Sequence, residues 1–340
     1  MSKALFPMQA TVCCGIDVSA QKLAVAVHEQ DQPFDRREFD NDAAGHKALI
    51  AWLGKRKARA RVSLEATGIY SLDLALALDK AEGIEVAMLN PKLVNRFAET
   101  LRRSKTDAAD AEALAEYSRR MPFVAWSAPA RNGLQLRAIT RYIDGLTVDR
   151  TRCGNRLHAA EGSASTPRCV LEDLRRSLEL LEMRIAKLRR EAMALVRADA
   201  DLAQQFKLLT GIPGIAQISA LQLMGELILL PAGMTVRQWV AQSGLDPAHE
   251  VSGSSVHKPS RISRAGNKHL RRALYMPALV ASRRDPHLKA FYESLLARHK
   301  ARLQALVAVA RKLLHAIYGI LHTQTPYDGA KLFPQLLPTS

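Results

Sequence analysis

Two short hydrophobic runs in the first third of the chain each end on a carboxylate. Asp17 follows the run at residues 13–16, and Glu65 follows the run at residues 62–64. Apolar runs of this length, bounded by turn residues, are typical of buried strands, and an acid at the end of such a strand is costly unless it has a partner. Asp107 and Asp110 begin a predicted helix and share one of its faces.

Four carboxylates that converge on one point repel one another, and a hard divalent cation that prefers oxygen ligands relieves this repulsion. A pair of such ions is the usual apparatus for cutting or joining phosphodiesters. Taken singly, Asp107 or Asp110 would complement the positive end of its helix dipole. Because Asp17 and Glu65 each close an apolar strand, we expect the four acids to act together in a metal-dependent nuclease centre.

The charge of the chain is unevenly distributed. Its formal net charge is +16 over 340 residues, which favours a polyanionic partner. Residues 1–125 hold 18 Lys and Arg against 17 Asp and Glu, whereas residues 126–340 hold 31 against 16. The basic residues are therefore concentrated in residues 126–340, the part of the chain that we expect to bind the phosphates of a nucleic acid. Aromatic residues make up only 5%, which disfavours a base-stacking single-strand binder.

Composition also bears on the compartment. The four cysteines have neither zinc-ligand nor disulfide-framework spacing, which fits a reducing cytoplasm. No apolar run reaches the roughly 18 residues that a membrane span needs, and no signal peptide or nucleotide-binding loop is visible. The sequence thus predicts a cytoplasmic, nucleoid-associated protein without a membrane partner.

Residues 1–126 predict an α/β domain. Strands are expected at 12–17, 23–28, 33–39, 62–65 and 85–89, and helices at 43–57, 69–81 and 107–120, with another helix opened by Pro91. A three-strand meander followed by alternating helices and strands is the element order of ribonuclease-H-like domains. In that fold the first acid lies on the first strand, the second on the fourth and the last on a late helix.

Residues 127–200 predict a helical middle segment. The stretch from 162 to 167, rich in Ser and Thr, marks a break within it. Beyond the break, apolar residues alternate spacings of three and four, a seam that fits either an antiparallel hairpin within one chain or a dimerising coiled coil. The seam comprises Leu171, Leu174, Leu178, Leu181, Ile185, Leu188, Ala192 and Leu195.

Residues 201–330 predict a third, mainly helical domain. Residues 208–215 lead into a helix at 216–230, which is the pattern of a helix-hairpin-helix. Gly211 and Gly214 would allow a tight turn whose backbone N–H groups face a phosphate. The alternative is an ordinary Gly-Pro turn between packed helices.

A serine-rich basic block follows at residues 251–272, and no acid occurs between Glu250 and Asp285. A serine in a flexible basic loop could attack a phosphodiester, and the resulting phosphoserine ester would conserve the bond energy for rejoining. From the residues alone, a loop that only contacts phosphates is the favoured alternative. The basic side chains expected to contact nucleic acid are Lys258, Arg261, Arg264, Lys268, Arg271 and Arg272.

These blocks closely resemble the DEDD transposases of the IS110 insertion-sequence family, the bridge-RNA-guided DNA recombinases. The resemblance spans nearly the whole chain in the right order. Its blocks are Gly15-Ile16-Asp17, Leu64-Glu65-Ala66-Thr67-Gly68, Lys105-Thr106-Asp107 to Asp110-Ala111, Ile212-Pro213-Gly214-Ile215, Ser243-Gly244-Leu245-Asp246-Pro247, Ser252-Gly253-Ser254-Ser255, Ser263-Arg264-Ala265-Gly266 and residues 270–276.

The resemblance implies a RuvC-like N-terminal catalytic domain, a coiled-coil middle and a C-terminal transposase domain. Ser252 matches the family's serine nucleophile, although Ser254 and Ser255 stand close by. The acids that match the family's Mg²⁺-binding tetrad are Asp17, Glu65, Asp107 and Asp110.

The implied mechanism joins the tetrad of one protomer to Ser252 of another. A covalent 5′-phosphoserine then forms, and strands exchange through a Holliday-type intermediate. The implied partners are donor and target double-stranded DNA and a structured bridge RNA whose loops pair with both. A composite site needs at least a dimer, and synapsis of two DNAs suggests a tetramer.

Two other functions compete with this one. A RuvC-class, metal-dependent junction or structure-specific endonuclease would use water as its nucleophile, but the basic serine block favours the recombinase. A non-enzymatic nucleic-acid-binding protein would use only the basic half, and the complete acid set argues against it. Asp246 stands where relatives commonly have a neutral residue, and the sequence assigns it no function.

Overall fold

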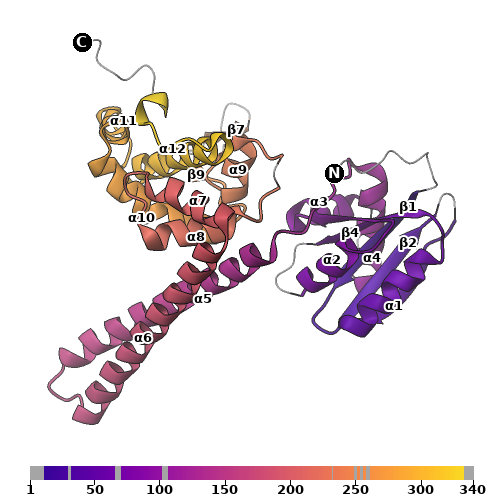
Figure 1. Cartoon of the computed structure of the whole chain (residues 1–340), viewed down its shortest axis with the longest axis horizontal. Helices are drawn as coiled ribbons and strands as arrows, with labels where there is room; N and C mark the ends of the chain where they lie inside the picture. The colour runs from indigo at the N-terminus through magenta and orange to yellow at the C-terminus, as the bar shows by residue number, and fades with distance from the viewer. Residues whose placement is uncertain are drawn as a thin grey trace. The chain divides into compact units, whose positions relative to one another are not determined.

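The computed structural model describes residues 11–29, 32–65, 70–101, 106–231, 233–248, 251–252, 256–257 and 261–332 (Figure 1). The chain forms two compact units, Met1–Ala128 and Pro129–Ser340. The predicted segments 127–200 and 201–330 both fall essentially within the second unit. A mixed α/β sheet followed by a mostly helical region is what the sequence predicted, and this part of the prediction is confirmed.

The first unit is built on a five-stranded sheet. Its spatial order is β3 (Asp35–Asp40), β2 (Lys22–His28), β1 (Thr11–Val18), β4 (Arg59–Glu65) and β5 (Ile84–Leu89). The pairs β1–β2 and β2–β3 are antiparallel, whereas β1–β4 and β4–β5 are parallel. β4 begins three residues before the predicted position because Arg59 already pairs with Thr11.

Helices cover both faces of this sheet. Leucines of α1 (Ala43–Gly54) and α2 (Leu72–Asp79) pack with Cys14 and Ile16 of β1 in one buried cluster. Because side chains alternate along a strand, Gly15 faces the other side, where a Cβ atom would stand 2.0 Å from the carbonyl oxygen of Ala111. α4 (Asp107–Arg120) therefore lies directly against β1 at this glycine. α3 (Pro91–Leu101) begins at Pro91 as predicted.

The second unit begins with two long antiparallel helices, α5 (Arg131–Glu161) and α6 (Arg168–Ala198). The predicted break at 162–167 is the connection between them. Ile143 and Leu146 of α5 pack against Ile185 of α6, and Ala192 of the seam is also buried. The seam thus has a partner helix within the same chain, which is the hairpin alternative.

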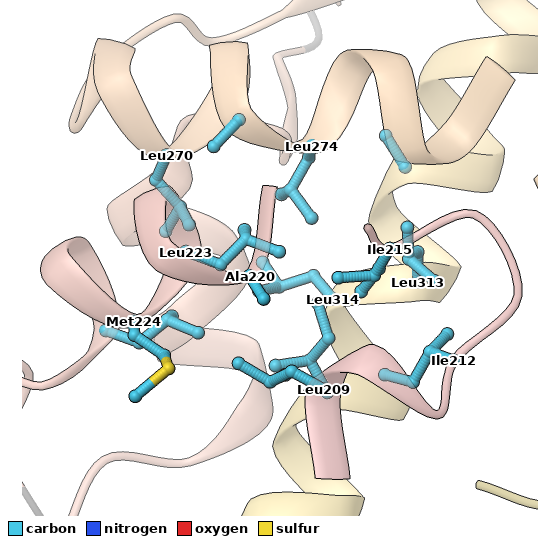
Figure 2. Close-up of a cluster of buried hydrophobic side chains, with 14 of the residues drawn as sticks. Leu209, Ile212, Ile215, Ala220, Leu223, Met224, Leu270, Leu274, Leu313 and Leu314 are labelled. Atoms are coloured by element: carbon cyan, nitrogen blue, oxygen red, sulfur yellow. The ribbon is translucent and has the colours of Figure 1, made fainter. Parts of the chain in front are cut away.

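Seven shorter helical elements make up the rest of the unit as far as the structure describes it. Leu209, Ile215, Leu223, Leu274 and Leu313 meet in its core, as Figure 2 shows. The elements are α7 (Ala200–Thr210), α8 (Gln217–Leu227), α9 (Val236–Ser243), α10 (Lys268–Arg284), α11 (Pro286–Ala297), α12 (Arg302–Thr323) and the 3₁₀ turn η1 (Gly329–Leu332).

Among the described residues, α12 is the one helix long and apolar enough to cross a membrane by length and composition. Its residues Val309, Leu313 and Ile317 are fully buried in the core of the unit, and Arg311 and Lys312 interrupt its apolar sequence. These features are those of a core helix.

Between α9 and α10 the chain forms a small two-tier hairpin. β6 (Pro247–Ala248) pairs with β9 (Arg261–Ile262), and β7 (Val251–Ser252) pairs with β8 (Val256–His257). We call the paired residues 247–248, 251–252, 256–257 and 261–262 the serine hairpin. It was expected as a loop, and its short antiparallel pairs align its two arms.

Candidate functional site

Asp17 and Glu65 lie at the ends of adjacent parallel strands. Ile16 of β1 pairs with Leu64 of β4, and the two acids are the next residue on each strand. Equivalent positions of paired strands face the same side of a sheet, so Asp17 and Glu65 share the face that α4 covers. Both are half-buried.

The other two acids stand in the first turn of α4. Thr106 caps this helix, and its side chain accepts a hydrogen bond from the backbone N–H of Ala109 at 3.3 Å. Asp110 directly precedes Ala111, the residue that lies over Gly15. Asp17 and Asp107 line one cleft beside α4, together with Ser19, Lys22, Arg36 and Glu38.

The positions of the four acids bear on whether they could hold a metal ion. Within the described ranges, no group of three or more His, Cys, Asp and Glu side chains is arranged so that it could hold a metal ion. Asp17 and Glu65 are neighbours on the sheet, and Asp17 and Asp107 share a cleft, but the structure does not assemble the four as a closed site. An all-carboxylate set has the oxygen donors that a hard cation prefers. The tetrad remains a prediction.

Two basic residues in the same cleft were missed by the sequence reasoning. The hydrogen bonds and charges of Asp40 and Glu38 raise the pKa of Lys22, whose ammonium lies 3.0 Å and 3.2 Å from them. Arg36 pairs with Glu112 of α4 at 2.5 Å. The alternation of β2 and β3 could have located both residues on the face of Asp17.

Ser252 lies on β7, where its backbone pairs with Val256. Lys258, Ser254 and Ser255 lie outside the described residues. The arms of the serine hairpin are joined to the end of α9 by backbone hydrogen bonds, from Ser263 to Asp246 O at 2.9 Å and from Arg264 to Gly244 O at 3.2 Å.

Asp246 has a structural role that the sequence did not reveal. Its carboxylate accepts a hydrogen bond of 2.5 Å from the hydroxyl of Ser263, beside the backbone bond between the same two residues. Asp246 therefore fastens the base of the serine hairpin.

Two family models match the chain. A transposase model, the IS110-type DEDD transposase, matches residues 14–160, and the model described as "Transposase IS116/IS110/IS902 family" matches residues 206–293. The first match contains all four acids, and the second contains Ser252. The chain belongs to the IS110/IS116/IS902 family of transposases.

Relatives align with most of this transposase. The pilin gene-inverting protein of Moraxella bovis is 27% identical over 300 residues, covering 85% of this chain and 89% of its own length. A candidate transposase of Sinorhizobium fredii, y4rJ, is 30% identical over 346 residues, covering 85% and 86%. The transposase for insertion sequence element IS1328 of Yersinia enterocolitica is 29% identical over 275 residues, covering 72% and 79%.

The predicted basic contacts of the transposase divide into two groups. Arg261, Arg264 and Lys268 are exposed on or after the serine hairpin. Arg271 is half-buried and donates to the carbonyl of Ser243 at 2.8 Å, and its burial, followed by the charge of Arg264, lowers its pKa. Arg271 thus holds the end of α9, and its expected contact with nucleic acid is not supported by this placement.

Arg272 belongs with the exposed group, although it has an internal partner. Its guanidinium lies 3.2 Å from Asp144 of α5, and about half of the side chain is exposed. The Asp144 side chain is only 13% exposed, so a mostly buried carboxylate holds Arg272 while the other half of its side chain faces solvent.

The Gly-Pro turn after α7 uses its glycines for packing. The N–H of Gly211 donates to Lys207 O at 3.2 Å within the chain. Gly214 has a φ of +97°, and a Cβ there would stand 2.6 Å from the carbonyl of Pro277 in α10. These contacts favour a turn between packed helices over the predicted phosphate-facing turn.

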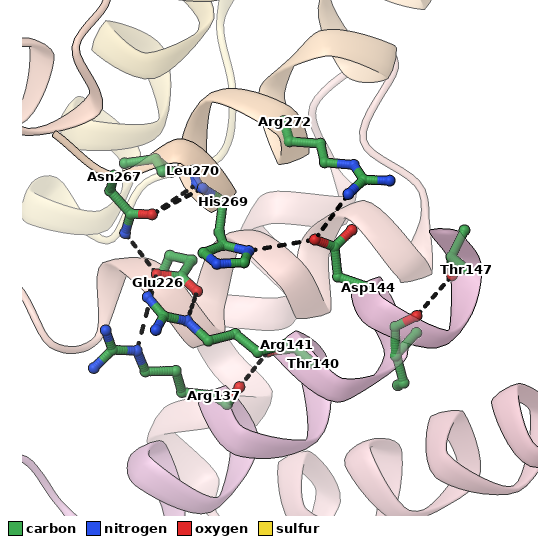
Figure 3. Close-up of polar contacts among 11 residues, drawn as sticks. Arg137, Thr140, Arg141, Asp144, Thr147, Glu226, Asn267, His269, Leu270 and Arg272 are labelled. Atoms are coloured by element: carbon green, nitrogen blue, oxygen red, sulfur yellow. Dashed lines mark hydrogen bonds and ion pairs between the residues drawn. The ribbon is translucent and has the colours of Figure 1, made fainter. Parts of the chain in front are cut away.

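The sequence reasoning also missed a buried carboxylate, Glu226 of α8, which is 4% exposed. Figure 3 shows it between Arg137, Arg141 and Asn267. A single acid inside the apolar stretch 220–228 was the available signal, because a charge on a buried helix needs a partner.

Proposed function

We propose that this transposase cuts and rejoins DNA strands with Ser252 as its nucleophile and with the four acids as ligands of Mg²⁺. The placement of Asp17 and Glu65 at equivalent ends of adjacent parallel strands, on the face covered by α4, is the observation that carries the proposal. Bound Mg²⁺ would supply Lewis-acid stabilisation of charge on the scissile phosphate.

The serine step is a phosphoryl transfer. The Oγ atom of Ser252 forms a bond to phosphorus while the bond to the 3′ oxygen breaks, so the strand retains a free 3′ hydroxyl and a 5′-phosphoserine. The serine proton passes to solvent, and the departing 3′ oxygen takes up a proton. Rejoining is the same exchange in reverse with a new 3′ hydroxyl, and it needs no added energy source.

We further propose that the acids and Ser252 of different protomers act on one phosphate, in a dimer or tetramer. A structured bridge RNA would select donor and target DNA by base pairing, while the protein reads backbone and shape. The excess of basic over acidic residues in positions 126–340 supports this assignment, since an RNA and two duplexes present many phosphates.

The test uses purified protein, Mg²⁺, labelled duplexes from the DNA that flanks the gene on each side, and RNA transcribed from the same flanks. We expect a DNA species of reduced mobility on denaturing gels that protease removes and that Ser252→Ala and Asp17→Asn both abolish. A matched control is Ser163→Ala, an exposed serine in the turn of the helical hairpin.

The alternative is a RuvC-class endonuclease that attacks with water. It is favoured by the acids on the sheet, which do not require a serine. Free cleaved ends with no protein attached, and undiminished cleavage by Ser252→Ala, would establish this alternative and overturn the serine mechanism.

A further inference from the structure

Glu226 is a buried acid of the helical unit, and both of its carboxylate oxygens have partners. Its two carboxylate oxygens accept from Arg141 at 2.7 Å and 2.9 Å, and Asn267 donates its side-chain N–H at 2.5 Å. Desolvation raises its pKa, but the hydrogen bonds and charges of Arg141, Asn267 and Arg137 outweigh this and leave the pKa of Glu226 below its ordinary value. Glu226 is therefore an anion under ordinary conditions.

Asn267 makes two different connections with one side chain. Its Oδ1 caps α10 by accepting from the backbone N–H groups of His269 at 3.0 Å and Leu270 at 3.2 Å. Its Nδ2 donates to Glu226, as Figure 3 shows. Glu226 of α8 is thereby hydrogen-bonded to Asn267, the residue that caps the start of α10.

Asn267 also fixes the end of the segment that follows the serine hairpin. Its backbone N–H donates to Gln242 O at 2.7 Å. The preceding Gly266 has a φ of +130°, and a Cβ there would stand 2.3 Å from the same oxygen. Both ends of residues 242–267, which include Ser252, are thus joined at Asn267.

The capping role alone does not require asparagine. Ser and Asp cap helices as well as Asn does. The short Ser side chain, however, has no donor that reaches Glu226 while its oxygen caps the helix, and Asp would place a second anion against Glu226. A buried ion pair is also weak support for stability, since apolar replacements often fold as well. The link between Asn267 and Glu226 is therefore better explained by a requirement for the position of the start of α10 than by a gain in stability.

We propose that Glu226 and Asn267 are positioning residues that set the placement of the serine hairpin relative to α8 and α10. The proposal rests on the function proposed for Ser252. Without the link, α10 keeps its cap, and Asp246 and Ser263 still join the arms of the hairpin, but the base of the hairpin loses its side-chain connection to Glu226 of α8. Misplacement of a nucleophile by about 1 Å costs roughly a hundredfold in rate.

The test compares Asn267→Ser with wild type in two measurements. We expect an unchanged melting temperature, amide hydrogen exchange about tenfold faster in peptides covering residues 244–264, and DNA–serine joining roughly ten- to a hundredfold slower. Affinity for the flanking-DNA duplexes and their RNA should stay the same. Glu226→Gln should also speed hairpin exchange and slow joining, although it lowers stability as well because it removes the charge paired with Arg141, and in these two rates the double variant should be less than additive because the two changes break one link.

A matched control is Asn132→Ser. Asn132 of α5 also donates its side-chain amide to a helix-capping carboxylate, Asp199, which caps α7, at 3.0 Å, and among the residues that the structure describes no contact of this pair involves the serine hairpin. It should alter neither measurement. Hairpin exchange and joining that remain at wild-type rates in Asn267→Ser would overturn the proposal, and so would equal losses in Asn132→Ser.

The two proposals fail separately. If Ser252→Ala still forms the DNA adduct, the proposed nucleophile is wrong, while faster hairpin exchange in Asn267→Ser would still support positioning. If Ser252→Ala abolishes the adduct and Asn267→Ser changes neither rate, the nucleophile stands and the positioning role is wrong.

Discussion

Glu65 of β4 stands beside Asp17 of β1 because each is one residue beyond the paired Ile16 and Leu64. The register of two parallel strands therefore brings together acids that are 48 positions apart in the sequence. A one-residue slip would turn one of them to the opposite face. The buried partners Ile16 and Leu64 hold the register, since both are fully inaccessible.

Asp17→Asn and Glu65→Gln should each lower Mg²⁺-dependent DNA cleavage by roughly 10²–10³-fold, because each removes one charged ligand of the proposed centre. Affinity for nucleic acid and the melting temperature should change little. The exposed Glu82 supplies the control as Glu82→Gln. Cleavage by Asp17→Asn at the wild-type rate would remove Asp17 from the centre.

Gly15→Ala should destabilise the first unit by about 1–3 kcal/mol or more, because the new methyl group meets the backbone of α4. Chemical unfolding followed by circular dichroism measures the change. Gly54→Ala is the matched control, since no atom lies within 4 Å of a Cβ placed there. Equal stabilities for the two variants would contradict the close approach of α4 to β1.

Gly214→Ala should cost about 1–3 kcal/mol in the free energy of unfolding, from its positive φ and from contact with Pro277. Gly211→Ala should cost much less, since Gly211 has helical backbone angles with φ of −74°. The folded fraction of Gly214→Ala should bind DNA as wild type does. A large loss of DNA affinity in Gly211→Ala with intact stability would instead restore the phosphate-facing turn.

The stability added by Glu226 should depend on acid pH. Its folded-state pKa is depressed, so its contribution is complete above the unfolded-state pKa of about 4.3 and is lost as the pH falls through the lower folded-state value. Urea unfolding of wild type and Glu226→Gln from pH 7 downward should show the wild-type advantage shrinking below about pH 4. An advantage that stays constant with pH would contradict the pairing.

The sheet could be predicted because its signals are local. Apolar runs ending on Asp17 and Glu65, and Pro91 at the start of a helix, mark elements within a few residues of themselves. The helical hairpin needed the structure, because a seam of apolar residues has the same spacing whether its partner is in the same chain or another.

Side-chain roles in the second unit could not be predicted from composition. Arg271 lies in a run of bases, yet the carbonyl of Ser243, 28 positions away, takes its guanidinium. Glu226 and Arg141 are separated by 85 positions, so no local pattern pairs them. Basic runs indicate a polyanionic partner only on average, and tertiary contacts decide which members of the run are free to bind it.

The helix α5 has mechanical consequences for the transposase. Its 31 residues extend about 46 Å at the usual rise, and near one end Arg141 grips Glu226 while Asp144 contacts His269 and Arg272 in the first turns of α10. A displacement of the distal end of α5 is thus coupled to the start of α10 through one continuous helix and these side-chain contacts. No loop intervenes between the two.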